Sequence, residues 1–311
     1  MSKKFDVLCA GLIVVDIIGS PIDRNIFDKD SVYIDSISLC SGGDAFNVSV
    51  NTAKQGLSVA IAGNIGNDRF GDHILAQAAK YGIDTQKIKR LDETSTATSM
   101  ALCESTGERH FAYSPGANRH FDGSGLDDML ASAKLLYIGS MLGLPGLENG
   151  NLTRLFAAAK EKGVITAVDT TWSENDDWMS VFDGALAYTD IFIPSYEEAV
   201  KLTGHKGKAE IVGFLKEQGV SVAGVKLGSE GAYIEGMDIP VINTDMVVDT
   251  TGAGDAFMSG FVCGYIKGRP IYECGLLGSA AASFCIEKFG AATNTRSFDE
   301  TMERVGFLNE T

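Results

Sequence analysis

The run with the clearest chemical potential is Asp249-Thr250-Thr251-Gly252-Ala253-Gly254-Asp255, which opens an apolar, helix-forming stretch. Small residues let a backbone approach a ligand closely, and the amides of Gly252, Ala253 and Gly254 can converge at the N-terminus of the helix. Such amides and the helix dipole form a site for an anion, above all for charge that develops during phosphoryl transfer. Asp255 falls in the first helical turn, where a carboxylate can accept the proton of an attacking hydroxyl. The run therefore predicts a phosphoryl-transfer centre with Asp255 as general base.

A simpler interpretation is that Asp255 only complements the helix dipole and that the glycines only make a tight turn after the strand-like residues Met246-Val247-Val248. The two interpretations predict effects of different size when Asp255 is removed. Removal of a first-turn charge costs about 0.3–1 kcal/mol of stability, whereas loss of a general base costs about 10²–10⁴-fold in rate. We favour the catalytic interpretation because two further motifs agree with it.

The second motif is Ser41-Gly42-Gly43-Asp44-Ala45-Phe46-Asn47, a glycine pair that leads into the helical stretch 48–55. Here Gly42 and Gly43 would bring the backbone close to a polar small molecule, and Asn47 could hydrogen-bond it. Taken alone, the run is explained equally well as a Gly-Gly turn with Asp44 as the helix N-cap.

The third motif, Val225-Lys226-Leu227-Gly228-Ser229-Glu230-Gly231, is a strand that ends in a Gly-rich loop. A nucleotide edge at the carboxyl ends of parallel strands has this form, although alone the motif is just a turn. A fourth candidate is Asp16, inside the apolar run 12–18, because a buried carboxylate needs hydrogen-bond donors. Sugar hydroxyls would be suitable donors, and a surface turn at the end of the strand is the alternative.

Composition limits the class of partner. The 311 residues include 26 Lys and Arg against 41 Asp and Glu, a formal net charge of −15, which argues against tight nucleic-acid binding. The six cysteines form no C-x-x-C pair, so we expect buried thiols in a reducing compartment. Asp6 and Asp16 interrupt the apolar N-terminal run, which fits a buried first strand better than a signal peptide. No segment approaches the ~20 apolar residues that cross a bilayer. We expect a cytoplasmic protein.

The elements that must position these motifs follow an alternating pattern. We expect strands at 59–63, 135–138, 164–169, 191–194 and 221–227, and helices at 69–81, 151–162, 195–202, 254–267 and 271–288. This alternation predicts an α/β fold with a mostly parallel sheet covered on both faces. No linker-like segment divides the chain, so a single domain over 1–311 is expected.

Two segments depart from this alternation of strands and helices. Residues 31–39 alternate loosely at strand spacing, and 96–103 and 108–113 are predicted to form two strands joined by Ser105-Thr106-Gly107. Polar alternate positions suggest a small sheet with one solvated face. We interpret the segments at roughly 14–40 and 96–115 as a lid over a pocket; a decorative hairpin and a subunit-pairing surface are the alternatives.

With these motifs in place, the chain resembles the ribokinase-like, or PfkB, family of carbohydrate and nucleoside kinases. The resemblance extends from Asp16 to Gly290, and the run at 249–255 matches the C-terminal signature of the family in full. The glycine pair with Asn47, followed by Gly56 and Gly66, is similar to the N-terminal signature.

The resemblance implies a three-layer sandwich with a small β-sheet lid and a general set of roles. Asp255 would activate a hydroxymethyl oxygen for attack on the γ-phosphate of ATP, beside an anion hole of backbone amides. The roles that it implies elsewhere are as follows: Asp16, Gly42, Gly43, Asp44 and Asn47 at the substrate, Lys226, Gly228 and Gly231 along the nucleotide, and Asp249, Thr251, Cys285 and Gly290 in a potassium-binding loop.

The chain departs from the family pattern at three positions. The family usually shows Asn-x-x-Glu after the strand at 191–194, and here Ser195 replaces the Asn while Glu198, expected near Mg²⁺, is kept. Ser-x-x-Glu is also a capping box, which is a purely local explanation. Ser279 stands where members often carry Asn or His against adenine. Asp44 replaces the Lys of ribokinase, so ribose is a poor first guess, and Arg109 is the first residue to test if the substrate is anionic.

Other classes of protein fit less well. The chain lacks the G-x-G-x-x-G of nicotinamide oxidoreductases and the G-x-x-x-x-G-K-[ST] of P-loop kinases. We therefore predict an ATP- and Mg²⁺-dependent sugar kinase that phosphorylates a primary alcohol and forms a homodimer through its lid. A nucleoside kinase of the same family, or a non-catalytic sugar-binding homologue, is the alternative.

Overall fold

The computed structural model describes residues 3–104, 109–173, 177–182 and 184–307. Its main feature is a nine-stranded sheet in the order β13-β12-β11-β10-β9-β8-β1-β4-β5. All neighbours run parallel except β11–β12 and β12–β13. The strands are β1 (Phe5–Gly11), β4 (Val59–Gly66), β5 (Asp84–Leu91), β8 (Ala133–Gly139), β9 (Ile165–Val168), β10 (Ile191–Phe192), β11 (Val222–Lys226), β12 (Ala232–Ile234) and β13 (Met237–Ile239).

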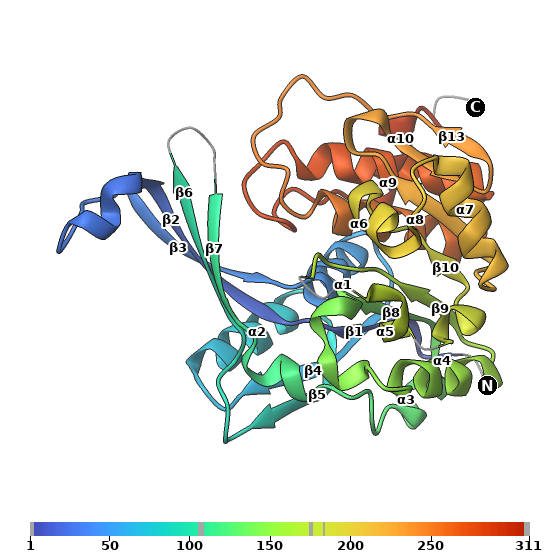
Figure 1. Cartoon of the computed structure of the whole chain (residues 1–311), viewed down its shortest axis with the longest axis horizontal. Coiled ribbons are helices and arrows are strands. Elements are labelled where there is room, and N and C mark those ends of the chain that lie inside the picture. Colours follow the sequence, from blue (N-terminus) through green and yellow to red (C-terminus); the bar gives the residue numbers. More distant parts are fainter. Residues whose placement is uncertain (1–2, 105–108, 174–176, 183, 308–311) are drawn as a thin grey trace.

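Helices cover both faces of this sheet, which makes a three-layer sandwich (Figure 1). One face carries α1 (Asp44–Lys54), α2 (Arg69–Lys80), α8 (Ala253–Ile266) and α9 (Ile271–Cys285), with α10 (Phe298–Val305) packed on α8 and α9. The other carries α3 (Asp127–Ser132), α4 (Asn151–Glu161), α5 (Trp178–Phe182), α6 (Tyr196–Thr203) and α7 (Lys208–Glu217). The expected α/β fold is confirmed.

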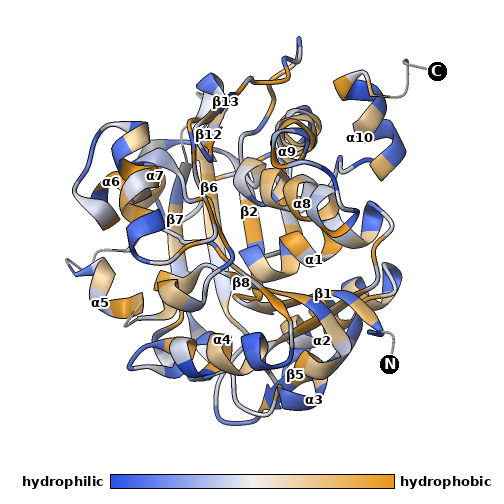
Figure 2. Ribbon diagram, turned by 90° about the vertical axis from the view of Figure 1, so that its right-hand side faces the viewer, coloured by the Kyte–Doolittle hydropathy of each residue, from blue (hydrophilic) through white to orange (hydrophobic). Residues whose placement is uncertain are grey.

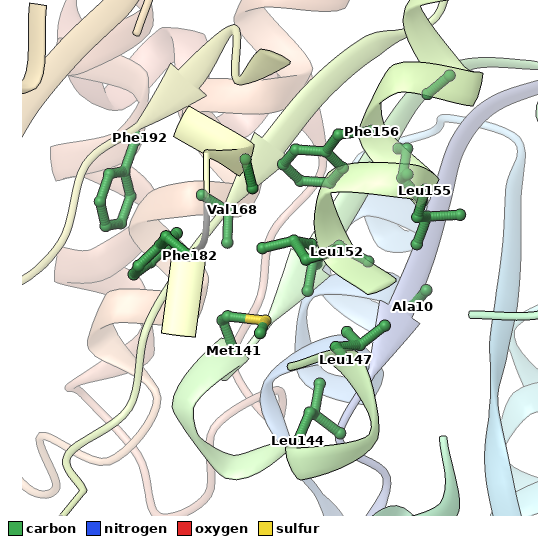
Figure 3. Packing of buried hydrophobic residues seen from close by; sticks show 14 of the residues in the cluster. Ala10, Met141, Leu144, Leu147, Leu152, Leu155, Phe156, Val168, Phe182 and Phe192 are labelled. Carbon is green, nitrogen blue, oxygen red and sulfur yellow. The ribbon is translucent and has the colours of Figure 1, made fainter. Parts of the chain in front are cut away.

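The hydrophobic pattern of the strands explains why both faces must be covered. In β1, Val7 and Cys9 belong to the core on the α1 and α8 side, whereas Leu8 and Ala10 belong to the core on the α4 side. Strands buried on both faces read as continuous apolar runs, and β1 and β8 are coloured accordingly in Figure 2. Figure 3 shows the α4 side, where Phe156 lies among the aliphatic side chains of the same core.

A second sheet of four strands stands away from the first (Figure 1). Its order is β3-β2-β6-β7, with β2 (Val14–Ile22), β3 (Ser36–Gly42), β6 (Thr98–Glu104) and β7 (Arg109–Ser114). We call these four strands the small sheet. Within it, β2 and β6 run parallel, and the outer pairs run antiparallel.

The expectation of one strand in the N-terminal run is wrong, because the chain forms two strands in two different sheets. The break follows Gly11, whose φ of 132° a residue with a side chain rarely adopts. A Cβ there would also lie 2.6 Å from the carbonyl oxygen of Gly139. Asp16 therefore lies on β2 in the small sheet, and not on the first strand of the central sheet.

Two further strand predictions need correction. The strand expected at 31–39 begins only at Ser36, where β3 finds its partner Ser20 on β2. Residues 246–248 form no strand: the backbone amides of Val248 and Asp249 bond the carbonyl oxygen of Ile286 instead of a neighbouring strand, and the side chains of Met246 and Val247 are exposed. A high β-propensity forms a strand only where a sheet edge is available. The turn predicted at 105–107 lies outside the described residues.

Candidate active site

Polar and charged side chains of the candidate site meet at the carboxyl ends of the parallel strands. Ser140 follows β8, Asp169 follows β9, Lys226 ends β11, and Glu198 lies in the first turn of α6 after β10. Because parallel strands end at one edge of their sheet, these side chains come from distant parts of the sequence to one place. The N-terminus of α8, with Asp255, lies at the same edge, near the ammonium of Lys226.

The first turn of α8 has the form expected of an anion-binding helix end. Gly252 is its N-cap with a φ of 77°, and a Cβ on Gly252 would lie 2.2 Å from the Cβ of Ala291. Gly252 is therefore required both by its backbone conformation and by its close neighbour. Ala253 and Gly254 follow as the first helical residues, so their N–H groups have no intrahelical acceptor. The N–H of Ala253 donates to the carbonyl oxygen of Thr250, before the helix, at 3.2 Å.

Asp255 lies in this turn as a largely buried carboxylate, 8% exposed. The side-chain amide of Asn47 donates a hydrogen bond of 2.8 Å to its Oδ2, which links α8 to α1. Burial raises the pKa of Asp255 to about 6, although the bond from Asn47 opposes that rise. A carboxylate with such a pKa is ionised near neutral pH and is a better proton acceptor than an exposed aspartate.

Asn47 presents a second polar atom to the site. Among the residues that the structure describes, its buried Oδ1 has no hydrogen-bond partner. A buried acceptor without a donor costs free energy. A ligand hydroxyl that donates to this oxygen would remove the cost and would lie beside Asp255.

Lys226 and Asp169 form a buried ion pair, with 2.5 Å between Nζ and Oδ2. Burial raises the pKa of Asp169 to about 7, against the attraction of Lys226. Burial alone would lower the pKa of Lys226, but the negative charges of Asp169 and Glu198 raise it. The ammonium also lies 3.6 Å from the position of a Cβ on Gly254. Lys226 therefore places a positive charge directly at the N-terminus of α8.

Glu198 accepts two hydrogen bonds through Oε2, from the hydroxyl of Thr170 at 3.0 Å and from the backbone N–H of Ser195 at 3.2 Å. The second bond is half of the capping box that explains Glu198 locally. Within the described part of the chain, no group of three or more acidic, His or Cys side chains could hold a metal alone. Proteins usually bind the Mg²⁺ of a nucleotide through one or two carboxylates together with the phosphates. The acidic side chains of this site suit Mg²⁺ bound in that way.

Asp44 begins α1 and accepts a hydrogen bond from the hydroxyl of Ser140. The N-cap is Gly43, so the expected alternative of Asp44 as N-cap is wrong. Burial, and then the charge of Asp255, raise the pKa of Asp44 well above its ordinary value. Ser140 has a left-handed φ of 57°, an uncommon conformation for serine that aims its hydroxyl at this carboxylate.

Both glycines of the second motif leave room for close neighbours. A Cβ on Gly42 would lie 2.1 Å from Oδ2 of Asp16, and one on Gly43, whose φ is 86°, would lie 2.5 Å from the carbonyl oxygen of Leu12. Asp16 is half-buried, and burial raises its pKa to about 6, opposed by a hydrogen bond from Ser99. The glycine pair thus gives the Asp16 carboxylate its space at the base of the small sheet.

The predicted nucleotide residues lie beyond Lys226. Gly228 begins a single 3₁₀ turn and Gly231 ends it, with φ values of 60° and 87°. A Cβ on Gly231 would lie 2.1 Å from the carbonyl oxygen of Ile239. Ser279 is buried in α9, and its hydroxyl accepts a 2.7 Å hydrogen bond from the backbone N–H of Ile242. Ser279 therefore fixes the segment after β13 in place.

The four residues of the predicted potassium loop lie together. The carboxylate of Asp249 accepts the N–H groups of Thr251 at 2.8 Å and Gly290 at 3.1 Å. The thiol of Cys285 contacts the carbonyl oxygens of Thr251 at 3.5 Å and Ala291 at 3.4 Å. Convergent carbonyl oxygens beside a carboxylate fit a hard cation.

The side chain of one expected residue is not placed by the structure, and two residues that were not expected lie at the site. The side chain of Arg109 lies outside the described part of the structure. Sequence reasoning missed Ser140, and it missed Asn118, whose buried amide bonds the backbone of Ile13 at 3.3 and 3.1 Å and the hydroxyl of Tyr113 at 3.4 Å. Asn118 thereby ties the link between β1 and β2 to the base of β7. No local pattern marks either residue, because both act on partners about 100 positions away.

This fold, with a buried carboxylate and a lysine at a glycine-rich helix N-terminus, defines a phosphotransferase that acts on small alcohols. Residues 4–297 match the pfkB family carbohydrate kinases, and the chain belongs to that family. Its relatives include an uncharacterized sugar kinase of Archaeoglobus fulgidus, 32% identical over 77% of this chain and 95% of that protein. A nucleoside kinase of Methanothermobacter thermautotrophicus is 28% identical over 98% of this chain and 96% of that protein.

Solved structures show the same fold. The ribokinase of Arabidopsis thaliana, determined with ribose and ATP, superimposes with a TM-score of 0.84 at 22% identity, and the match covers 99% of this chain and 100% of that chain. The expected carbohydrate kinase and the ribokinase-like fold are therefore confirmed. In the described residues, no helix combines the length and the apolar character that a membrane span requires.

Proposed function

We propose that this kinase transfers the γ-phosphate of ATP to a primary hydroxyl of a monosaccharide or sugar derivative, with Asp255 as the general base. The observation that carries the proposal is the buried Asp255 carboxylate, held by Asn47 in the same first turn of α8 whose N–H groups have no acceptor within the helix. A base and an anion hole three residues apart can act on the two partners of one displacement.

The steps follow from the placement of these groups. The substrate oxygen attacks the γ-phosphorus while Asp255 takes its proton, and the bond from the γ-phosphorus to the bridging oxygen breaks to release ADP. The amides of Gly252, Ala253 and Gly254 stabilise charge on the transferred group. Magnesium bound with ATP would supply positive charge to the phosphates, and Glu198 would contact the coordination shell of this ion.

The substrate would occupy the space between the central sheet and the base of the small sheet. Asp16, Asp44 and Asn47 offer hydrogen-bond acceptors there, and Gly42 and Gly43 leave room for them. Acceptors of this kind suit the hydroxyl donors of a sugar. The nucleotide would lie along Gly228 and Gly231, with Ser279 near its base, and the loop at 249–251 and 285–291 would bind K⁺.

We further propose that residues 1–311 form one kinase domain with the small sheet as its lid, and that a second copy of the chain covers this sheet. Leu39 and Met100 both pair with Ile17, so they lie on one face, and Ile37 lies two residues along. These three side chains are 45%, 48% and 73% exposed. Exposed apolar clusters mark interaction surfaces. Sedimentation at micromolar concentration should show a dimer, and a monomer would contradict this part of the proposal.

A substrate panel tests the proposed reaction. ADP release would be measured with ATP and Mg²⁺ against ketoses, aldoses, sugar acids and nucleosides, with and without K⁺. We expect release with at least one sugar, dependent on Asp255. Release with nucleosides alone would make the chain a nucleoside kinase like its Methanothermobacter relative. Release from the Asp255→Asn variant at the normal rate would contradict the assignment of the base.

A further inference from the structure

Lys226 lies at a helix end that repels its charge, and the carboxylates of Asp169 and Glu198 compensate for that repulsion. Its ammonium lies beside Gly254 in the first turn of α8, a helix of 14 residues. The N-terminus of a helix carries a partial positive charge, so a cation there is repelled. A buried ion pair is also weak evidence for stability, because desolvation offsets much of the attraction between its members. A contribution to folding stability therefore explains little of why a lysine occupies this position.

Asp169 holds this ammonium through one oxygen only. Its Oδ2 contacts Nζ of Lys226 at 2.5 Å, whereas its Oδ1 accepts the backbone N–H of Thr170 at 2.9 Å. The backbone of Lys226 is fixed separately, because its N–H donates to the carbonyl oxygen of Pro194 at 2.8 Å. A single contact at the end of a flexible side chain can be exchanged for another anion without movement of either strand.

Gly254 marks the place where another anion could replace Asp169 at the ammonium of Lys226. The ammonium lies 3.6 Å from the position that a Cβ on this glycine would take, so it borders the surface where the amides of the α8 turn are presented. An anion bound by those amides comes within reach of Lys226 as well. In the proposed reaction that anion is the γ-phosphate of ATP.

We propose that Asp169 is a stand-in for the γ-phosphate: it neutralises Lys226 while the site is empty and gives up the ammonium to the phosphate when ATP binds. This inference rests on the proposed function for the place of the γ-phosphate. Lys226 is then a residue that helps to distinguish ATP from ADP, together with the amides of the α8 turn, and Asp169 is a positioning residue that competes with the phosphate for the same ammonium.

The competition predicts effects of opposite sign on nucleotide affinity. Calorimetry would compare Mg²⁺-ADP with the Mg²⁺ complex of adenylyl imidodiphosphate, a nonhydrolysable ATP analogue, in the absence of sugar. Lys226→Met should weaken the analogue about tenfold or more, the usual value of a hydrogen bond to a charged group, and should change ADP less than about threefold. Asp169→Asn should tighten the analogue about three- to tenfold and leave ADP unchanged.

Two further variants control for folding. Lys226→Met leaves Asp169 buried without a partner, so the double variant Lys226→Met/Asp169→Asn, which removes both charges, should fold and should bind the analogue as weakly as Lys226→Met. The exposed pair Lys208 and Asp238, which joins α7 to β13, provides a matched control. Lys208→Met and Asp238→Asn should change neither affinity.

Weaker analogue binding in Asp169→Asn, or an equal loss of ADP and analogue in the double variant, would overturn the inference and assign the pair a structural role. These binding measurements do not depend on which group takes the proton. If Asp255→Asn kept normal turnover, the proposed base would fail while the opposite signs at Lys226 and Asp169 could still hold.

Discussion

The carboxyl edge of the central sheet and the small sheet treat their side chains in opposite ways. At the edge, charged groups are buried and held: Asp169 is bonded to Lys226 and Thr170, and Asp255 to Asn47. In the small sheet, apolar side chains such as Ile37 and Met100 are exposed, and Asp16 lies half-buried near its base.

Under the proposed function, this difference separates two tasks. Phosphoryl transfer requires groups fixed to a fraction of an ångström, which the sandwich supplies because its strands and helices are packed on both sides. Recognition of the acceptor requires a surface that can close over a ligand, and a thin sheet outside the main core suits that purpose. Changes at the edge should therefore affect turnover, and changes at the small sheet should affect acceptor affinity.

The largest effect is expected from Asp255→Asn, which should lower kcat about 10²–10⁴-fold. The raised pKa of Asp255 means that ionisation of its carboxyl costs the folded protein stability as pH rises through about 6. Asparagine removes that cost, so the melting temperature at pH 8 should be unchanged or slightly higher. ADP release and calorimetry measure the two quantities. A variant that loses activity only because it unfolds would argue against the catalytic role.

A smaller loss is expected from Gly252→Ala, at the N-cap of α8. The added methyl group would meet Ala291 at 2.2 Å and would disturb the amides of the turn, so kcat should fall about 10²-fold. Gly268, with a φ of 75°, follows the other end of α8, and no described atom lies within 4 Å of its Cβ position. Gly268→Ala should cost only about 1–2 kcal/mol of stability. Equal losses of turnover in the two variants would contradict an anion hole at Gly252.

The pH dependence should separate the two regions. Burial raises the pKa of both Asp255 and Asp16 to about 6, and in the proposed reaction both carboxylates act in their ionised form. Below pH 6, kcat/KM should therefore fall about a hundredfold per pH unit when two protons are taken up. In Asp16→Asn the fall should be about tenfold per unit. If kcat/KM of the variant still fell about a hundredfold per pH unit, protonation of Asp16 would not be one of the steps that lower activity.

At pH 8, the effect of Asp16→Asn should be the smallest of the four effects predicted here. Its loss removes a charged hydrogen-bond acceptor for the substrate, so KM for the sugar should rise about tenfold while kcat stays within about threefold. Asp30→Asn, an exposed change in the segment between β2 and β3, is the control and should leave both constants unchanged. A loss in kcat alone would place Asp16 with the transfer groups instead.

Local pattern predicted the regular elements well. The helix expected at 69–81 is found as Arg69–Lys80, and the helix expected at 254–267 as Ala253–Ile266, because apolar periodicity and glycine positions are local signals. The strand expected at 246–248 failed because strand formation depends on a neighbouring edge. The division of the N-terminal run between two sheets depends on the close approach of Gly11 to Gly139, which no local pattern contains.

The site was predictable to the extent that its motifs are contiguous. The glycine-rich turn and Asp255 could be found in the sequence, and the structure places Lys226 next to them. The sequence did not predict which side chains bond to one another at the site. The bond of Ser140 to Asp44 and that of Lys226 to Asp169 join residues 96 and 57 positions apart. Such pairings arise from the order of strands in the sheet.

A crystal structure with the Mg²⁺ complex of adenylyl imidodiphosphate and a sugar identified by the panel tests the central claim most directly. We expect the terminal phosphate to accept hydrogen bonds from the N–H groups at Gly252–Gly254, with a sugar hydroxyl within hydrogen-bond distance of Asp255. A terminal phosphate bound away from this turn, or a sugar without a hydroxyl near Asp255, would contradict the account.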